Sequence, residues 1–434
     1  MRLWSGSWTL LTLSAVVVAC SNVSTGTSTS VPTTSEPSPT VARSTATTDV
    51  GSTSTSMGPI EGEPDPVDVL WSAAGVGMTD AFFSDNRLLA ADDKTVFVAD
   101  GWSGLSETPR AAMTALSAVS GDLLWQRTDL STVNFPTGLF IQLLAHERLI
   151  VNDEEGLLAA LAPATGETIW SIELPVGYSA SGAVASEGVI YLGAHATSES
   201  DTRSPIAYAV DLADGSVIWQ KPLAEGTDLQ PIAPAVSDNS ILFSTTLSHP
   251  GSAEGNLIHA LSTQDGSAVW DLSLGGEQQF KFFPILIQDN IAIVPGWEET
   301  LGVSIDNGNT FWATPGVQPL VQTGGERALT RTNQGIAEID WQDGETRLLT
   351  RVDWSQGIYR PNGGRLINDQ LVISDGLRLQ AYSVHDGEAL WRWSAAPGTI
   401  VDNHVAVGEA IAVPVGHQTA QEPDDRRVVL IDPP

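Results

Sequence analysis

The chain has 434 residues, with 20 Lys and Arg against 52 Asp and Glu, so its formal net charge is 20 − 52 = −32. Phosphate binding needs clustered cations, so this balance argues against a nucleic-acid-binding protein and against charge-driven attachment to an anionic membrane. Hydrophobic residues make up 42% of the chain, which supports a sizeable core and excludes global disorder. The single cysteine excludes intramolecular disulfides and any zinc or iron–sulfur site built from cysteines.

Residues 1–19 are typical of a signal peptide. Arg2 precedes an apolar run from Leu10 to Ala19, which is too short to span a bilayer. The run ends in Val17-Val18-Ala19-Cys20, a pattern that resembles the bacterial lipobox. That resemblance implies cleavage before Cys20 and acylation of its thiol, which predicts a protein lipid-anchored on the extracytoplasmic face of the cell membrane. The alternative is an ordinary secretory signal in which the cysteine is incidental.

Residues 20–66 begin with this cysteine and continue as a Ser/Thr/Pro-rich tract with almost no large apolar side chains before Ile60. Such a tract has too little apolar surface to form a core, so we expect a disordered tether. As a flexible coil it would reach roughly 35–40 Å, which would lift a folded domain off the membrane.

One phrase recurs from Val67 to the end of the chain: a short alternating strand, a turn that contains Gly, three further residues and then Trp. Asp214-Gly215 followed by Trp219 is one example. The Gly supplies the positive φ that a tight hairpin needs, and the preceding Asp bonds to its own backbone. A degenerate copy around Gly344 has Leu348 where Trp is expected, which predicts the weakest contact between repeats.

β-branched runs and short alternating segments precede each phrase, which predicts four strands per repeat and little helix. The repeats are spaced by about 36 to 51 residues, a period typical of propeller blades. Strand 67–72, which ends in an orphan copy of the Trp phrase, should pair with strand 428–432 and close the ring. The predicted fold is therefore an all-β, eight-bladed β-propeller of four-stranded antiparallel blades, with residues 67–434 as one domain.

The repeat resembles the PQQ-like repeat of quinoprotein-type propellers, and the resemblance covers 67–434. In that family the repeat Trp packs between neighbouring blades and bonds through its indole N–H, a role that suits a large ring with one donor. The resemblance therefore implies a structural role for the repeat tryptophans, which are Trp71, Trp125, Trp170, Trp219, Trp270, Trp312 and Trp391.

The same resemblance raises the alternative of a PQQ-dependent, calcium-assisted alcohol or sugar dehydrogenase. Many such enzymes place a vicinal disulfide against the quinone, and Cys20 alone cannot form one. The long insertions that build those active sites are also missing. His195, His249 and His417 belong to different repeats and do not form a metal-binding pattern. We therefore expect no catalytic residue, no cofactor and no metal, and favour a protein that is not an enzyme.

A non-catalytic binding scaffold is the remaining interpretation, and it resembles the propeller lipoprotein of the outer-membrane β-barrel assembly machinery. The loops between second and third strands share a face with the loops that enter the inner strands. On this face the candidate contact residues are Lys281, Arg360, Tyr178, Gln230, His404, Trp102 and Trp297. Alternatively, the cations pair with local carboxylates and the tryptophans fill space between loops. The expected partner of this monomeric scaffold is an envelope or extracellular protein or a glycan, with no nucleic acid.

Overall fold

The computed structural model divides the chain into two compact units, Met1–Ile60 and Glu61–Pro434. It describes the following residues: 67–74, 89–100, 112–130, 139–153, 155–197, 204–224, 227–229, 234–247, 256–275, 284–296, 298–323, 327–352, 354, 364–374, 378–395, 399–401, 404–417 and 427–433. The predicted signal peptide, Cys20 and the tether lie outside these ranges. Within them, no helix has the length and apolar character needed to cross a bilayer.

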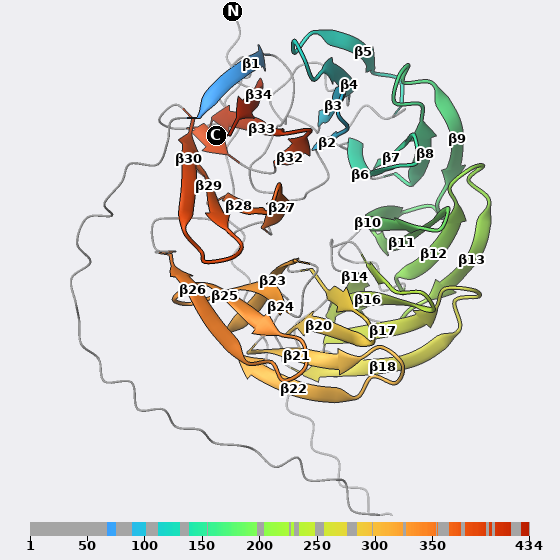
Figure 1. Cartoon of the computed structure of the whole chain (residues 1–434). Helices are drawn as coiled ribbons and strands as arrows, with labels where there is room; N and C mark the ends of the chain where they lie inside the picture. The colour runs from blue at the N-terminus through green and yellow to red at the C-terminus, as the bar shows by residue number, and fades with distance from the viewer. Residues whose placement is uncertain are drawn as a thin grey trace, which may run out of the picture. The chain divides into compact units, whose positions relative to one another are not determined.

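The described residues of the second unit form eight antiparallel sheets arranged in a ring (Figure 1). Blades 1 to 7 are meanders of four successive strand positions, β2–β5 through β27–β30, and blade 8 combines β31–β34 with β1. This confirms the predicted eight-bladed, four-stranded propeller. The inner strands are β2 (Leu89–Ala91), β6 (Leu139–Ala145), β10 (Tyr178–Ser186), β14 (Thr227–Leu229) with β15 (Ala235–Val236), β19 (Leu286–Gln288), β23 (Val317–Gln322), β27 (Arg365–Ile367), and β31 (Thr399–Val401) with β32 (Val405–Val407).

The other three strand positions follow outward in the same blade order. The second strands are β3 (Thr95–Asp100), β7 (Arg148–Asp153), β11 (Val189–Ala196), β16 (Ser240–Leu247), β20 (Ile291–Pro295), β24 (Arg327–Thr332), β28 (Gln370–Ser374) and β33 (Ala410–His417). The third strands are β4 (Ala112–Ser117), β8 (Leu157–Leu161), β12 (Ile206–Asp211), β17 (Asn256–Ser262), β21 (Glu299–Ser304), β25 (Gly335–Asp340), β29 (Arg378–Ser383) and β34 (Arg427–Asp432). The outer strands are β5 (Leu123–Arg127), β9 (Thr168–Glu173), β13 (Val217–Pro222), β18 (Ala268–Gly275), β22 (Thr310–Pro315), β26 (Thr346–Arg351), β30 (Ala389–Ser394) and β1 (Asp68–Ala74).

The ring closes where β1 completes blade 8. β1 pairs antiparallel with β34, from Asp68 opposite Asp432 to Ala74 opposite Arg427. This is the predicted pairing of the two ends of the folded chain. It gives the edge of β34 a partner that would otherwise be missing.

Each repeat Gly has the positive φ that the hairpin was predicted to need, from 66° at Gly266 to 76° at Gly215. The Gly of one blade also lies under the Trp of the preceding blade. A Cβ on Gly215 would come 2.7 Å from the ring carbons of Trp170, and one on Gly121 would come 2.8 Å from those of Trp71. The glycine is therefore needed twice, for the turn and for the indole stacked on it.

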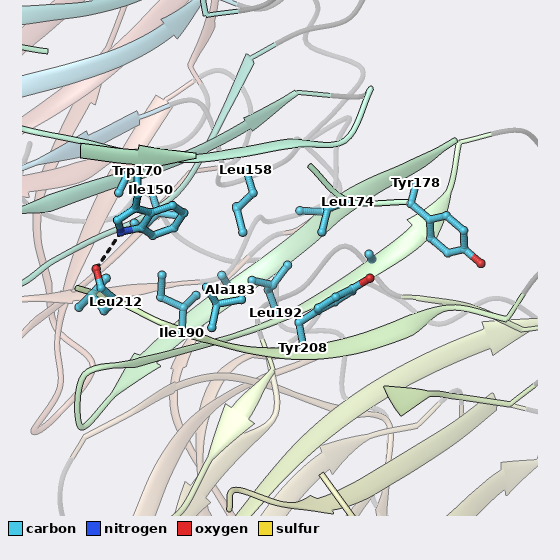
Figure 2. Close-up of a cluster of buried hydrophobic side chains, with 14 residues drawn as sticks. Ile150, Leu158, Trp170, Leu174, Tyr178, Ala183, Ile190, Leu192, Tyr208 and Leu212 are labelled. Carbon is cyan, nitrogen blue, oxygen red and sulfur yellow. Dashed lines mark hydrogen bonds between the residues drawn. The ribbon is translucent and has the colours of Figure 1, made fainter. Parts of the chain in front are cut away.

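The indole N–H groups of six repeat tryptophans donate to backbone carbonyls of the next blade. The Nε1–O distances run from 2.6 Å for Trp270 to Ile305 up to 3.0 Å for Trp170 to Leu212. Around Trp170, Ile150 and Leu158 from blade 2 pack against Ile190 and Leu192 from blade 3 (Figure 2). The core thus consists of layers between blades, and six of these layers are closed at one end by a hydrogen-bonded indole.

The degenerate copy in blade 6 differs from the sequence expectation. Elsewhere the outer strand bulges just before the Trp; Ile218, for example, is skipped between Val217 and Trp219. In blade 6 the bulge follows Leu348 and skips Leu349. Leu348 is consequently 37% exposed, and Leu349 takes its place against Gly387 of blade 7. The expectation that Leu348 substitutes for the Trp was wrong by one residue, because the bulge moved.

Candidate functional site

The meander topology gives the ring two unlike faces. In every blade, the turns from first to second strand and from third to fourth strand lie at one edge of the sheet, which we call the turn face. The loops from second to third strand and the connections into the next inner strand lie at the opposite edge, which we call the entry face. The predicted binding residues belong to the entry face.

The turn face is strongly acidic. Exposed carboxylates lie in nearly all of its described turns. They are Asp93, Glu147, Glu187, Asp238, Asp289, Asp369 and Glu409 in first turns of every blade but blade 6, and Asp122, Glu167, Asp214, Asp265, Asp306, Asp343 and Asp386 in the second turns of blades 1 to 7. Local hydrogen bonds hold several of them ionised. The backbone N–H of Ser216 lowers the pKa of Asp214, and the Ser267 side chain lowers that of Asp265.

The entry face carries many of the basic residues. Basic residues at strand ends on this side include Arg331, Arg351, Arg365, Arg378 and Arg427. Lys221 also lies near a strand end here, but its side chain packs against Gly266 in a turn of the neighbouring blade. Arg331 stacks on Trp354, with its guanidinium carbon 4.4 Å from the ring centroid, and the Trp354 indole donates to the Thr332 carbonyl. Burial alone lowers the pKa of Arg331. The entry face also carries carboxylates at strand ends, among them Asp153, Glu173 and Glu299, so it has charges of both signs. The turn face is the more acidic of the two and would repel an acidic ligand more strongly.

Two of the predicted contact residues are buried. Tyr178 begins β10 with 4% of its surface exposed, and its hydroxyl donates to the Ser204 carbonyl at 2.9 Å. His404 precedes β32 with 1% exposed, because it packs into blade 7. Neither side chain is displayed on the surface as a contact residue would be. Lys281, Arg360, Gln230, Trp102 and Trp297 lie outside the described residues.

Two of the three histidines that were considered as metal ligands lie in separate blades, blade 3 and blade 8. His195 is part of β11, where it lies opposite Ser179, and His417 ends β33. His249 lies outside the described residues. Among the residues that the structure describes, no three His, Cys, Asp or Glu side chains converge as metal ligands would.

A hydrogen-bonded row in blade 4 was not predicted. His259 on β17 shares a hydrogen bond with Thr245 of β16 through Nε2 at 3.0 Å and one with Asp271 of β18 through Nδ1 at 2.7 Å. The order hydroxyl, imidazole and carboxylate resembles a nucleophile with its base. However, Thr245 has no exposed surface and its hydroxyl is held within the sheet. Because no substrate can reach it, the row stabilises blade 4 rather than performing catalysis.

The pKa of His259 is lowered, mainly by burial, although Asp271 opposes the shift. His259 lies directly opposite Asp271 on β18 and opposite Phe243 on β16. Thr245 is two residues beyond Phe243 and therefore lies on the same face of the sheet. The sequence signal was therefore present as three polar residues on one sheet face. It was not recognised because their register depends on the pairing of three strands.

Comparisons with known proteins identify the repeat. A family model described as outer membrane protein assembly factor BamB matches residues 202–329. The chain is a PQQ-like repeat propeller that resembles BamB. It is 25% identical to the outer membrane protein assembly factor BamB of Nitrosomonas eutropha over 286 residues, which are 65% of this chain and 57% of the length of that relative.

Solved structures show the same fold at low identity. BamB from Moraxella catarrhalis superposes with a TM-score of 0.55 at 16% identity, over 85% of this chain and 98% of the other. The quinohemoprotein alcohol dehydrogenase ADHIIG from Pseudomonas putida HK5 gives a TM-score of 0.59 at 11% identity, over 85% of this chain and 76% of the enzyme. The BamB-like propeller and the dehydrogenases thus share this architecture, and the fold alone does not separate their functions.

Proposed function

We propose that this protein is a lipid-anchored envelope lipoprotein whose propeller is a non-catalytic scaffold that binds an envelope protein or a glycan through its entry face. The observation that carries the proposal is the PQQ-like repeat propeller that resembles an outer membrane assembly factor. The many exposed carboxylates of the turn face, which would repel an acidic partner, support the choice of the entry face.

The anchor is proposed at Cys20, the residue that ends the lipobox-like Val17–Cys20 sequence. Metabolic labelling with a fatty acid, followed by fractionation of the envelope, tests it. We expect label on the wild-type protein, and we expect Cys20→Ala to lose the label and the membrane association together. A labelled Cys20→Ala variant, or an unlabelled wild type that starts at another residue, would contradict the anchor.

The binding face is tested by crosslinking in the native envelope. We expect Lys281→Glu and Arg360→Glu to reduce the recovered crosslinked partner, because both place an acid on the entry face. Asp214→Lys and Asp265→Lys are the matched controls, since they alter charge on the opposite, turn face. Equal loss of the partner from both pairs of variants would indicate a general charge effect and contradict the assignment of the face.

A PQQ-dependent dehydrogenase is the second candidate, favoured by the architecture shared with the quinohemoprotein alcohol dehydrogenase. The residues of this chain do not fit that group well, because the described residues bring no three acidic ligands together and the single cysteine cannot form the vicinal disulfide. Purified protein supplied with PQQ and calcium, an alcohol or sugar and an artificial electron acceptor tests the alternative. Turnover that disappears on chelation of calcium would establish the enzyme and overturn the scaffold.

A further inference from the structure

Three large apolar side chains are exposed on the outer rim of the ring, where blade 8 meets blade 1. They belong to Leu70 on β1, to Val119 in the second turn of blade 1 and to Leu123 at the start of β5. Their exposed fractions are 52%, 88% and 59%. β1 and β5 follow each other around the rim in Figure 1. We call these three residues the rim patch.

The contacts of Trp71 bring the rim patch together. Its indole donates to the Ala118 carbonyl at 2.9 Å, and a Cβ on Gly121 would come 2.8 Å from its ring, so the second turn of blade 1 packs on β1. Leu70 directly precedes Trp71 as the extra residue of the outer-strand bulge. Val119 directly follows Ala118 in the turn. The two apolar residues therefore lie on either side of one hydrogen bond between the blades.

Leu123 faces the same boundary from the side of blade 1. It is the register partner of Leu116 on β4, and Leu116 packs into the apolar layer between blades 8 and 1. Residues that lie opposite each other in an antiparallel pair share one face of the sheet, so Leu123 is on the side of blade 8. The rim patch thus crosses the line where the ring closes.

The other repeats show that the fold does not need large apolar residues at these positions. The position of Val119 is small or polar in the other second turns, where it is occupied by Ala164, Ala213, Gln264, Asp306, Gln342 and His385. The position of Leu123 is taken by Thr168 in blade 2 and by Thr310 in blade 5. None of the other boundaries with this turn, all of which the structure describes here, has large apolar residues at all three positions. Exposed apolar side chains gathered in this way are typical of an interaction surface.

Two carboxylates flank the rim patch without a counter-charge. Asp68 begins β1 directly opposite Asp432 on β34, and both residues are exposed. Asp432 lies two residues beyond Leu430, which packs in the layer between blades 8 and 1, so it is on the side of the rim patch. Among the described residues neither carboxylate has an ion-pair partner, and Lys94 in the first turn of blade 1 forms no ion pair either. Like charges placed directly opposite each other destabilise a strand pair, so a cation from outside would relieve this one.

These charges determine which kind of occupant suits the rim patch. A second copy would bring its own Asp68 and Asp432 together with a net charge of −32. An anionic bilayer would be repelled for the same reason. The segment of this chain that precedes β1 carries Glu61, Glu63 and Asp65 and would add to the repulsion. A positively charged occupant is therefore the complementary one.

We propose that the rim patch binds a short segment of a partner protein that combines large apolar side chains with lysine or arginine. The apolar side chains cover Leu70, Val119 and Leu123, while the cations neutralise the opposed carboxylates of Asp68 and Asp432. The rim patch lies at the turn-face end of the outer strands. It is therefore a second interaction surface, separate from the entry face and independent of the role proposed for that face.

The first test measures the anisotropy of a fluorescein-labelled Lys-Leu-Lys-Leu-Lys peptide that is titrated with the purified full-length protein. Val119→Gln combined with Leu123→Thr, both residues that other repeats use, should weaken binding about tenfold or more. Val217→Thr is the matched control, since Val217 has the repeat position of Leu123 in blade 3 and is 46% exposed. Equal affinities of the double variant and the wild type would overturn the site. A Lys-Ser-Lys-Ser-Lys peptide that binds as tightly would also overturn it, because charge alone would then explain the binding.

The second test separates the carboxylate pair from the overall charge of the protein. Asp432→Asn should weaken peptide binding and should melt no lower than the wild type, because it removes a repulsion. Asp306→Asn makes the same charge change in an exposed turn of blade 5 and should leave binding unchanged. Equal weakening by the two substitutions would indicate a general charge effect and would contradict the proposal. A lower melting temperature of Asp432→Asn with unchanged binding would assign Asp432 a structural role instead.

Two measurements test the other occupants. Sedimentation velocity of the wild type should show no dimer that Val119→Gln dissociates. Flotation with phosphatidylcholine vesicles, carried out in Cys20→Ala so that no lipid anchor contributes, should show no binding that Val119→Gln removes. A dimer or vesicle binding that depends on Val119 would replace the proposed partner with a second copy or a bilayer. Because none of these experiments involves the entry face, failure here leaves the crosslinking test of that face unaffected.

Discussion

The indole of Trp170 in blade 2 lies against Gly215 of blade 3, so closely that a Cβ at residue 215 would be 2.7 Å from two carbons of the ring. The indole N–H then donates to the Leu212 carbonyl in the same turn (Figure 2). One turn therefore supplies both the flat surface and the acceptor for the Trp of its neighbour. Blade contacts of this kind depend on a residue that has no side chain.

This relationship predicts that Gly215→Ala is more destabilising than an ordinary change at a positive φ. The variant has about 1–2 kcal/mol of backbone strain and, in addition, about 1–3 kcal/mol from displacement of the indole. Gly188→Ala is the matched control, because Gly188 has a φ of 79° but no atom within 4 Å of its Cβ position. Chemical denaturation of both variants measures the difference, and equal losses would show that the stacking is unimportant.

The shifted bulge of blade 6 predicts opposite roles for two adjacent leucines. Leu349→Ala should cost about 2 kcal/mol or more, because it empties the contact with Gly387 and the blade 7 core. Leu348→Ala should cost less than about 1 kcal/mol, because Leu348 is 37% exposed and does not occupy the position against Gly387. Urea denaturation of the two variants decides the register. A larger loss of stability in Leu348→Ala would contradict the shifted bulge and would indicate that Leu348 occupies the position of the repeat Trp.

Trp219 should tolerate truncation poorly. It is 7% exposed, it stacks on Gly266 and its indole donates to the Thr263 carbonyl at 3.0 Å. Trp219→Ala is expected to cost about 3–5 kcal/mol, with a lowered denaturation midpoint. Trp219→Phe retains most of the ring and removes the donor, so it should recover a large part of the loss. If the Phe variant were as unstable as the Ala variant, the hydrogen bond would outweigh the packing.

Stability should fall with acidification through His404. Burial, followed by the charge of Arg365, lowers the pKa of His404 to about 3 in the folded protein, whereas its ordinary value is 6.5. The unfolded state therefore binds the proton first, and the contribution to stability is complete above pH 6.5 and is lost between pH 6.5 and 3. The slope is at most about 1.4 kcal/mol per pH unit from this group.

The measurement is a set of denaturation curves between pH 3 and pH 7 at constant ionic strength. His404→Gln removes the titrating group and should flatten the dependence over this range. His259, whose pKa is also lowered, remains in the variant and accounts for the residual slope in the same direction. An unchanged slope in His404→Gln would contradict the assignment.

The sequence allowed the blade count, the hairpin glycines and the inter-blade tryptophans to be predicted, because each is set by a short local phrase. It did not reveal the shifted bulge near Leu349, since bulge position depends on how two strands pair. Trp391 also differs from the other repeat tryptophans, because its indole N–H donates to the side-chain Oε1 of Gln370 in its own blade, at 2.7 Å. The following blade takes its outer strand from the other end of the folded chain, so no glycine turn is available to receive Trp391.

The candidate site was harder to predict than the fold. His404 was recognised as an entry-face residue, but its burial results from packing against blade 7, which no local pattern reports. The acidity of the turn face was present in the turn sequences from the start, since an acidic residue accompanies nearly every turn of that face.

The pairing of β1 with β34 also governs the order in which the molecule can be completed. Seven blades consist of strands that are consecutive in the chain and can assemble as they are synthesised. β1 is synthesised before all of them, yet it acquires its partner only after β34 has appeared. Until β34 forms, the first strand therefore has no pairing partner in the ring. During that interval its apolar Val69 and Leu70, which are about half exposed even in the closed ring, are open to self-association.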